Sequence, residues 1–138
     1  MMIRVRSKVV LLVAPHVVGL EVLPNNKVFK HISAIPAIFP SIHDIKPNLL
    51  ILDYDYLVQD IEKILRRLRA NIAYKNIRIC CYKNKWHSKI DPFLKTLGVD
   101  HIFYAEDMQD EVTRKSAFDA IGNVIMDGTF FNLLKPVH

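Results

Sequence analysis

The sequence contains few residues that break or crosslink a chain: its 138 residues include four glycines, seven prolines and two cysteines. With hydrophobic residues at 51%, this is the composition of a packed globular protein, not of a disordered or fibrous one. Cys80 and Cys81 are adjacent, so on a strand their side chains would point to opposite faces, and no disulfide between them is expected. This cysteine usage predicts a cytoplasmic protein.

Long apolar runs are also missing. No stretch of about 18 or more apolar residues occurs, so no membrane-spanning helix is expected. The apolar run 9–14 follows three basic residues, but it is short and ends at Pro15 and His16, which favours a buried strand over a signal peptide. The length predicts a single domain over 1–138, with its core between about residues 7 and 131 and a short tail at each end.

The motifs of common enzyme classes are absent. There is no glycine-rich phosphate loop, no G-x-S-x-G nucleophile elbow and no Cys–His pattern. The six histidines show no HxxxH or HxH spacing and have no companion cysteine pair, so no metal site is expected. We therefore predict that the protein is not an enzyme.

The chain does contain an alternation of short apolar runs and longer amphipathic stretches. Apolar runs predict strands over 8–14, 48–52, 77–82 and 101–104, with a further strand around 28–32. Amphipathic patterns predict helices over 61–72, 86–97 and 112–126, with Gly98 as a C-terminal cap, and less regular helices over 17–23 and 36–45. Because strand–helix–strand connections are right-handed, this order predicts an α/β protein with three layers, a doubly wound parallel five-stranded sheet between helices.

The helix over 61–72 shows the clearest amphipathic pattern. Its apolar residues recur at spacings of three and four, and its arginines occupy the complementary face. The apolar positions are Ile61, Ile64, Leu65, Leu68 and Ile72, and the arginines are Arg66, Arg67 and Arg69.

In parallel sheets of this kind, functional residues usually follow the carboxyl ends of the strands. The order of three segments resembles the receiver domain of bacterial response regulators. They are KPNLLILDYDY (46–56), the helix containing ILRRLR (64–69) and GVDHIFYAED (98–107). The tail FDAIGNVIMDGTFF (118–131) is similar to the last helix of receivers of the NarL branch. The resemblance covers nearly the whole chain, and it implies a flavodoxin-like fold and a role in two-component signalling.

The resemblance implies a phosphoacceptor aspartate at the end of the third strand, and Asp53 stands at that position. Receivers also carry two acids after the first strand, which hold a Mg²⁺ ion beside the acceptor. Here those positions correspond to Ala14, Pro15 or His16, none of which is a carboxylate. Asp53 is therefore interpreted as a structural cap or a relic in preference to a working acceptor.

Two further receiver positions also depart from the pattern. Cys81 stands where receivers carry Thr or Ser at the end of the fourth strand, and Ala105 stands where they carry Lys at the end of the fifth. Asp55 adds one carboxylate, which is too few oxygens for a hard-cation cage. We expect that the usual Mg²⁺-dependent phosphorylation is lost and that no cofactor is needed, with Mg²⁺ required only if Asp53 accepts phosphate.

The formal net charge of +5 conceals an uneven distribution. Residues 63–95 contain ten basic residues and one acid, a local charge of +9, whereas residues 100–127 contain seven acids and two basic residues, a local charge of −5. Such complementary segments favour a homodimer or a signalling partner. The expected interaction surface comprises Arg66, Arg67, Lys85, Lys89, Asp107, Asp110 and Glu111.

Three functional hypotheses stay open. The preferred one is an atypical receiver-like signalling or scaffolding module that acts by protein–protein contact. The second is a true phosphoacceptor that uses Asp53. The third is a small nucleic-acid-associated protein that uses the basic third and fourth helices, with Trp86, Tyr74 and Tyr82 among the charges of the basic face. A charged face that only maintains solubility is the simplest alternative to all three.

Overall fold

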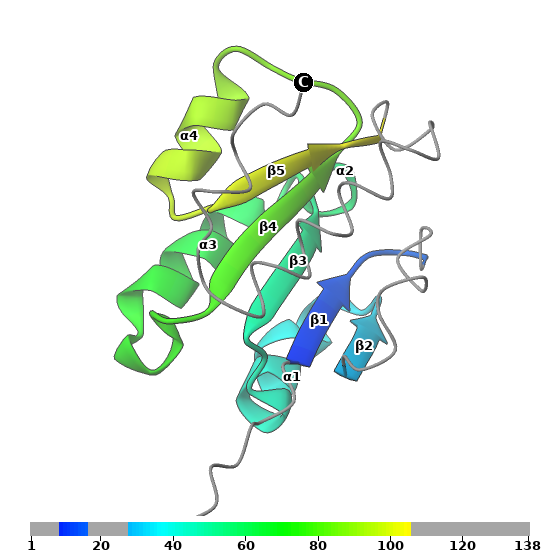
Figure 1. Ribbon diagram of the computed structural model, residues 1–138, viewed down its shortest axis with the longest axis vertical. Coiled ribbons are helices and arrows are strands. Elements are labelled where there is room, and N and C mark those ends of the chain that lie inside the picture. The colour runs from blue at the N-terminus through cyan, green and yellow to red at the C-terminus, as the bar shows by residue number, and fades with distance from the viewer. Residues whose placement is uncertain (1–8, 17–27, 106–138) are drawn as a thin grey trace, which may run out of the picture.

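A parallel β-sheet forms the centre of the protein, whose structure, a computed structural model, describes residues 9–16 and 28–105. All neighbouring strands pair in parallel, in the order β2-β1-β3-β4-β5 (Figure 1). The predicted five-stranded parallel sheet is thus confirmed. Its strands are β1 (Val9–Val13), β2 (Val28–Ile32), β3 (Leu49–Asp53), β4 (Arg78–Lys83) and β5 (His101–Tyr104).

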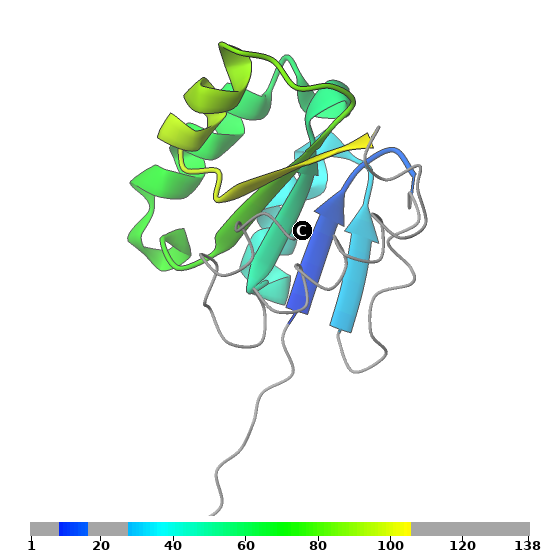
Figure 2. The same ribbon diagram turned by 45° about the horizontal axis from the view of Figure 1, so that its top comes forward.

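The described helices pack on one side of this sheet (Figures 1 and 2). Every second residue of a strand faces the helices, and residues such as Leu11, Leu50 and Ile79 pack with the apolar side chains of the helices in one buried cluster. The chain adds β2 on one side of β1 and then crosses to β3 on the other, so the strand order reverses between β1 and β3. The helices are η2 (Ile35–Ala37), α1 (Ile38–Ile45), α2 (Tyr54–Leu57), α3 (Ile61–Ala70), η3 (Ile72–Tyr74) and α4 (Ile90–Thr96).

The predicted helix over 61–72 is shorter than expected. Helix α3 ends at Ala70, because Asn71 takes an extended conformation and its side chain accepts a hydrogen bond of 2.9 Å from the Ala73 N–H. Ile72 was expected to be buried, but its side chain is 84% exposed. The apolar spacing therefore extends to a residue two positions beyond the end of the helix.

Arg69 corrects a second detail of that prediction, since its guanidinium points inward instead of into solvent. It donates hydrogen bonds to the carbonyls of Lys75, Ile77 and Gly98 at 3.2, 3.2 and 2.5 Å. Gly98 follows α4 with φ at 109°, as a C-terminal glycine should, and a Cβ there would meet Arg69 Nε at 2.3 Å. Glycine at this position both ends the helix and leaves room for the arginine.

Two other predicted helices begin later than expected. Helix α4 starts at Ile90, so residues 84–89 form a loop after β4. Helix α1 starts at Ile38 and tolerates Pro40 because its first turn has no helical partner for a backbone N–H. The predicted helices over 17–23 and 112–126 lie outside the described residues, and no helix within the described residues is long and apolar enough to cross a membrane.

Candidate functional site

Asp53 lies at the carboxyl end of β3, beside the point where the strand order reverses. Its Oδ1 accepts a hydrogen bond of 3.2 Å from the Tyr56 N–H, so the side chain caps α2. Burial raises the pKa of this carboxyl; the Tyr56 N–H opposes that shift, and the charge of Asp55 adds to it. The Asp53 side chain is therefore the N-cap of α2.

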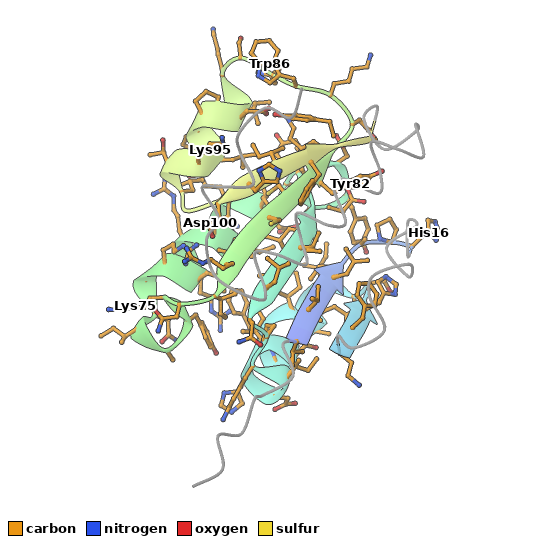
Figure 3. The ribbon with its side chains drawn as sticks, in the orientation of Figure 1. His16, Lys75, Tyr82, Trp86, Lys95 and Asp100 are labelled. Carbon is orange, nitrogen blue, oxygen red and sulfur yellow. The ribbon has the colours of Figure 1, made fainter. Side chains whose placement is uncertain are left out.

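The residues after β1 add no acidic group to this site. Ala14 is fully buried, and its backbone is occupied: the N–H donates to the Ile32 carbonyl at 3.1 Å, and the carbonyl lies 2.8 Å from His31 Nε2. Pro15 and His16 are exposed, and His16 lies at the outer rim of the sheet (Figure 3). The residues after β1 therefore bond to neighbouring backbone and side chain, in the case of Ala14, or face solvent, in the case of Pro15 and His16.

Of the remaining predicted pocket residues, Asp55 follows β3 and Ala105 follows β5, whereas Cys81, expected at the end of the fourth strand, lies within β4 two residues before its end and packs in the core under the helices. Cys81 is buried, and this burial raises the pKa of its thiol to about 12, so the thiol stays neutral and unreactive at physiological pH. Asp55 Oδ2 accepts a hydrogen bond of 2.8 Å from the Asn84 N–H, and Ala105 directly follows β5. Both cysteines are free, as expected for adjacent strand residues.

These residues line one edge of the sheet without forming a hard-cation site. Among the described residues, no three His, Cys, Asp or Glu side chains cluster as metal ligands would. The carboxylates of Asp53 and Asp55 each accept a backbone hydrogen bond, and Mg²⁺ needs a near-octahedral set of oxygens. Within residues 9–16 and 28–105, the carboxylates at this edge therefore do not supply the oxygens that a receiver's Mg²⁺ site needs.

A buried ion pair at the same edge was missed by the sequence analysis. Lys83, the last residue of β4, is 3% exposed, and its Nζ lies 2.5 Å from Oδ1 of Asp91, which is 4% exposed. The Tyr104 hydroxyl donates to Asp91 Oδ2 at 2.5 Å, and the Lys83 Nζ lies 4.9 Å from the centre of the Tyr54 ring. This network, the Lys83–Asp91–Tyr104 cluster, joins α4 to the carboxyl ends of β4 and β5.

The electrostatics of the cluster favour a charged carboxylate. Burial tends to raise the pKa of Asp91, but the hydrogen bonds from Lys83 and Tyr104, a bond from the His87 backbone and the lysine charge outweigh it and lower the pKa. Asp91 is therefore ionised at neutral pH. The ammonium of Lys83 is committed to Asp91.

Strand alternation separates this cluster from Asp53. Leu52 and Cys81 belong to the core under the helices, so Asp53 points to the opposite face while Lys83 points toward the helices. The same alternation, applied to residues 79, 81 and 83, was the available signal that Lys83 would be buried. Its partners, however, come from separate elements and only the fold brings them together.

The predicted interaction surface divides into separate regions. Arg66 forms an exposed ion pair of 2.9 Å with Glu62 on its own helix, and the Arg67 guanidinium lies 3.9 Å from the centre of the Phe39 ring of α1. Lys85 and Lys89 are exposed in the loop between β4 and α4. Asp107, Asp110 and Glu111 lie outside the described residues.

The expectation of aromatic residues along one basic face is wrong. Trp86 is 65% exposed beyond the carboxyl end of β4, whereas Tyr74 precedes β4 and packs against Phe39 with the ring centres 6.4 Å apart. Tyr82 is a partly buried residue within the strand, and Figure 3 shows it well apart from Trp86. The three aromatic side chains therefore do not form a continuous stacking surface.

No protein-family model matches the sequence, and no curated protein matches it.

Proposed function

We propose that the chain is an atypical receiver-like module, with the three-layer flavodoxin-like fold, that acts by protein–protein contact and does not use Mg²⁺-dependent phosphorylation. The strand order β2-β1-β3-β4-β5 supports the fold, because flavodoxin-like sheets share this order. The location of Asp53 at the end of β3 supports the resemblance to receivers.

The buried ion pair between Lys83 and Asp91 is the observation that carries the proposal. A phosphoryl group on an aspartate needs cations that neutralise its charge. The buried ammonium at this edge is instead held by Asp91 and fastens α4, while Asp53 caps α2. The edge is thus built as a fixed structure, which suits a docking surface better than a phosphate-responsive one.

The loop at residues 84–89 is the contact surface that fits this function best. Asp55 holds the Asn84 N–H at its start, and at its end His87 Nδ1 accepts from the N–H groups of Lys89 and Ile90, each at 3.1 Å. The side chain of Trp86 is exposed in this loop, and tryptophan is one of the residue types that most often contribute strongly to the binding energy of protein interfaces. The adjacent lysines favour an acidic partner.

A second copy of the chain supplies the acidic partner in this proposal, through the segment with Asp107, Asp110 and Glu111. We expect light scattering at low salt to show a dimer that dissociates at high salt. Trp86→Ala and the double variant Lys85→Glu/Lys89→Glu should each shift the protein to monomer. The matched double variant Lys30→Glu/Lys63→Glu, which reverses two exposed charges elsewhere, should leave the dimer intact.

Two outcomes would contradict the proposal. A monomer at high protein concentration and low salt would exclude self-association as the contact. Saturable shifts of the Asp53 and Asp55 amide resonances on addition of beryllofluoride with Mg²⁺ would show that the site still accepts phosphate. The latter result would favour the phosphoacceptor hypothesis.

A further inference from the structure

A second charged region lies at the opposite end of the strands, where β4 and β5 begin. It is a cleft of about 560 Å³ between the end of α3, the start of β4 and the end of α4. Figure 3 shows Lys75, Lys95 and Asp100 along this flank, away from Trp86. The charged residues that line the cleft are Arg69, Lys75, Arg78, Lys95 and Asp100.

One wall of the cleft is held in place by the chain itself. Arg69 donates to three backbone carbonyls, and Asp100 Oδ2 accepts a hydrogen bond of 2.8 Å from the Ile79 N–H. The Asp100 carboxylate lies 3.6 Å from Arg69 and 3.9 Å from Arg78. The carboxylate of Asp100 is therefore already balanced by the Ile79 N–H and two guanidinium groups, so the remaining basic groups leave the cleft with an excess of positive charge.

The other cations of the cleft are open to solvent. Lys75, Arg78 and Lys95 are exposed, and neither lysine ammonium has an ion-pair partner among the described residues. Four basic groups thus line the cleft with one carboxylate. Three unbalanced charges in a concave site raise the local concentration of anions.

The lining also indicates which part of a ligand is recognised. Ile77 and Val99 supply its apolar side chains, and none of the described residues that line the cleft is an aromatic on which a nucleobase could stack. Its volume lies in the range of small-molecule sites. Recognition would therefore act through charge and hydrogen bonding.

We propose that this cleft binds a small anion that carries two or more phosphate groups, recognised through its phosphates by Lys75, Arg78 and Lys95. The site is distinct from Asp53, because it lies at the amino ends of the strands. It would give the module a ligand site that is separate from its contact surface.

Calorimetric titration with sodium tripolyphosphate tests the proposal. Saturable binding is expected, and Lys75→Gln/Lys95→Gln should weaken it by about tenfold or more for each lysine removed. The control Lys30→Gln/Lys63→Gln removes the same charge from exposed positions outside the cleft and should change the affinity by less than about twofold. Thermal melting should show that both variants remain folded.

Further measurements separate the cleft from general attraction between opposite charges. Tripolyphosphate should shift the amide resonances of Ile77, Gly98 and Asp100, and ATP should bind with affinity within about threefold of tripolyphosphate because no base contact is expected. Absence of saturable binding would overturn the proposal, as would equal losses in the two double variants. Preferential binding of an oligonucleotide that tripolyphosphate does not displace would overturn it as well.

Discussion

Removal of Asp91 should be among the most destabilising single changes in the described part of the chain. Asp91→Ala leaves the Lys83 ammonium, 3% exposed, without its carboxylate partner at 2.5 Å, and it also removes the acceptor of the Tyr104 hydroxyl. The Tyr54 ring at 4.9 Å offers a weak substitute. Breaking one side of a buried ion pair costs about 3–5 kcal/mol, so we expect a loss of that size in the free energy of unfolding.

Urea denaturation of a small set of variants distinguishes the ion pair from simple packing. Asp91→Asn keeps an acceptor for the lysine and should cost less than Asp91→Ala. The double variant Lys83→Met/Asp91→Leu removes both charges at similar volume and should be close to the native protein in stability, because neither charge is left unpaired. A loss below about 1 kcal/mol in Asp91→Ala, or a double variant as unstable as the sum of its single variants, would refute the reasoning.

The same pair gives a pH dependence of known sign. The folded-state pKa of Asp91 is lowered from its usual 3.8, so the folded protein binds this proton less readily than the unfolded chain. The stabilisation is therefore complete above the unfolded pKa and is lost as the pH falls through the folded pKa. In Asp91→Asn this acid-dependent component should disappear from the profile of unfolding free energy against pH.

Two other predictions concern the amino-terminal end of β5. Burial, assisted by the charge of Lys95, lowers the pKa of His101 from 6.5 to about 4, so a titration followed by NMR should find this ring neutral at pH 5. Because the unfolded chain takes up this proton more readily than the folded protein, the free energy of unfolding should decrease by about 3 kcal/mol as the pH falls from 6.5 toward 4. A normal histidine pKa would contradict this. Gly98→Ala should destabilise the protein by about 1–3 kcal/mol, since φ is 109° and the new Cβ would meet Arg69 Nε at 2.3 Å. In urea denaturation that loss should be smaller in an Arg69→Ala background, and an unchanged loss would show that the arginine is not the obstacle.

Several strands were predictable because short apolar runs carry their own signal. Residues 49–52 are apolar at every position, which only a strand buried on both faces explains well, and the position of Asp53 followed directly from the end of that run. The end of α3 was not predictable from spacing, because Asn71 interrupts the helix while Ile72 still satisfies the period. Local patterns thus locate elements better than their last residues.

The side-chain partners were beyond the reach of local patterns. From the sequence, Lys83 and Asp91 entered only the sum of charges over residues 63–95. Their pairing depends on the end of β4 lying beside the first turn of α4. Arg69 likewise finds its carbonyl acceptors in two separate segments, the turn before β4 and Gly98, which is 29 residues away. A charge becomes structural only through such contacts, and the sum of charges along a segment contains no information about them.

The local charge of +9 in residues 63–95 is consequently not a single basic face. Lys83 is neutralised by Asp91, and Arg69 is held by backbone carbonyls. Besides Lys63, Arg66 and Arg67 on α3, the exposed basic residues fall in two regions, the loop around Trp86 and the cleft around Lys75 and Lys95. These regions lie at opposite ends of β4, and substitutions at distant sites combine additively. Trp86→Ala should therefore abolish dimerisation and leave tripolyphosphate affinity unchanged, whereas Lys75→Gln/Lys95→Gln should do the reverse. Loss of both properties in either variant, measured by light scattering and calorimetry, would show that the basic segment acts as one surface after all.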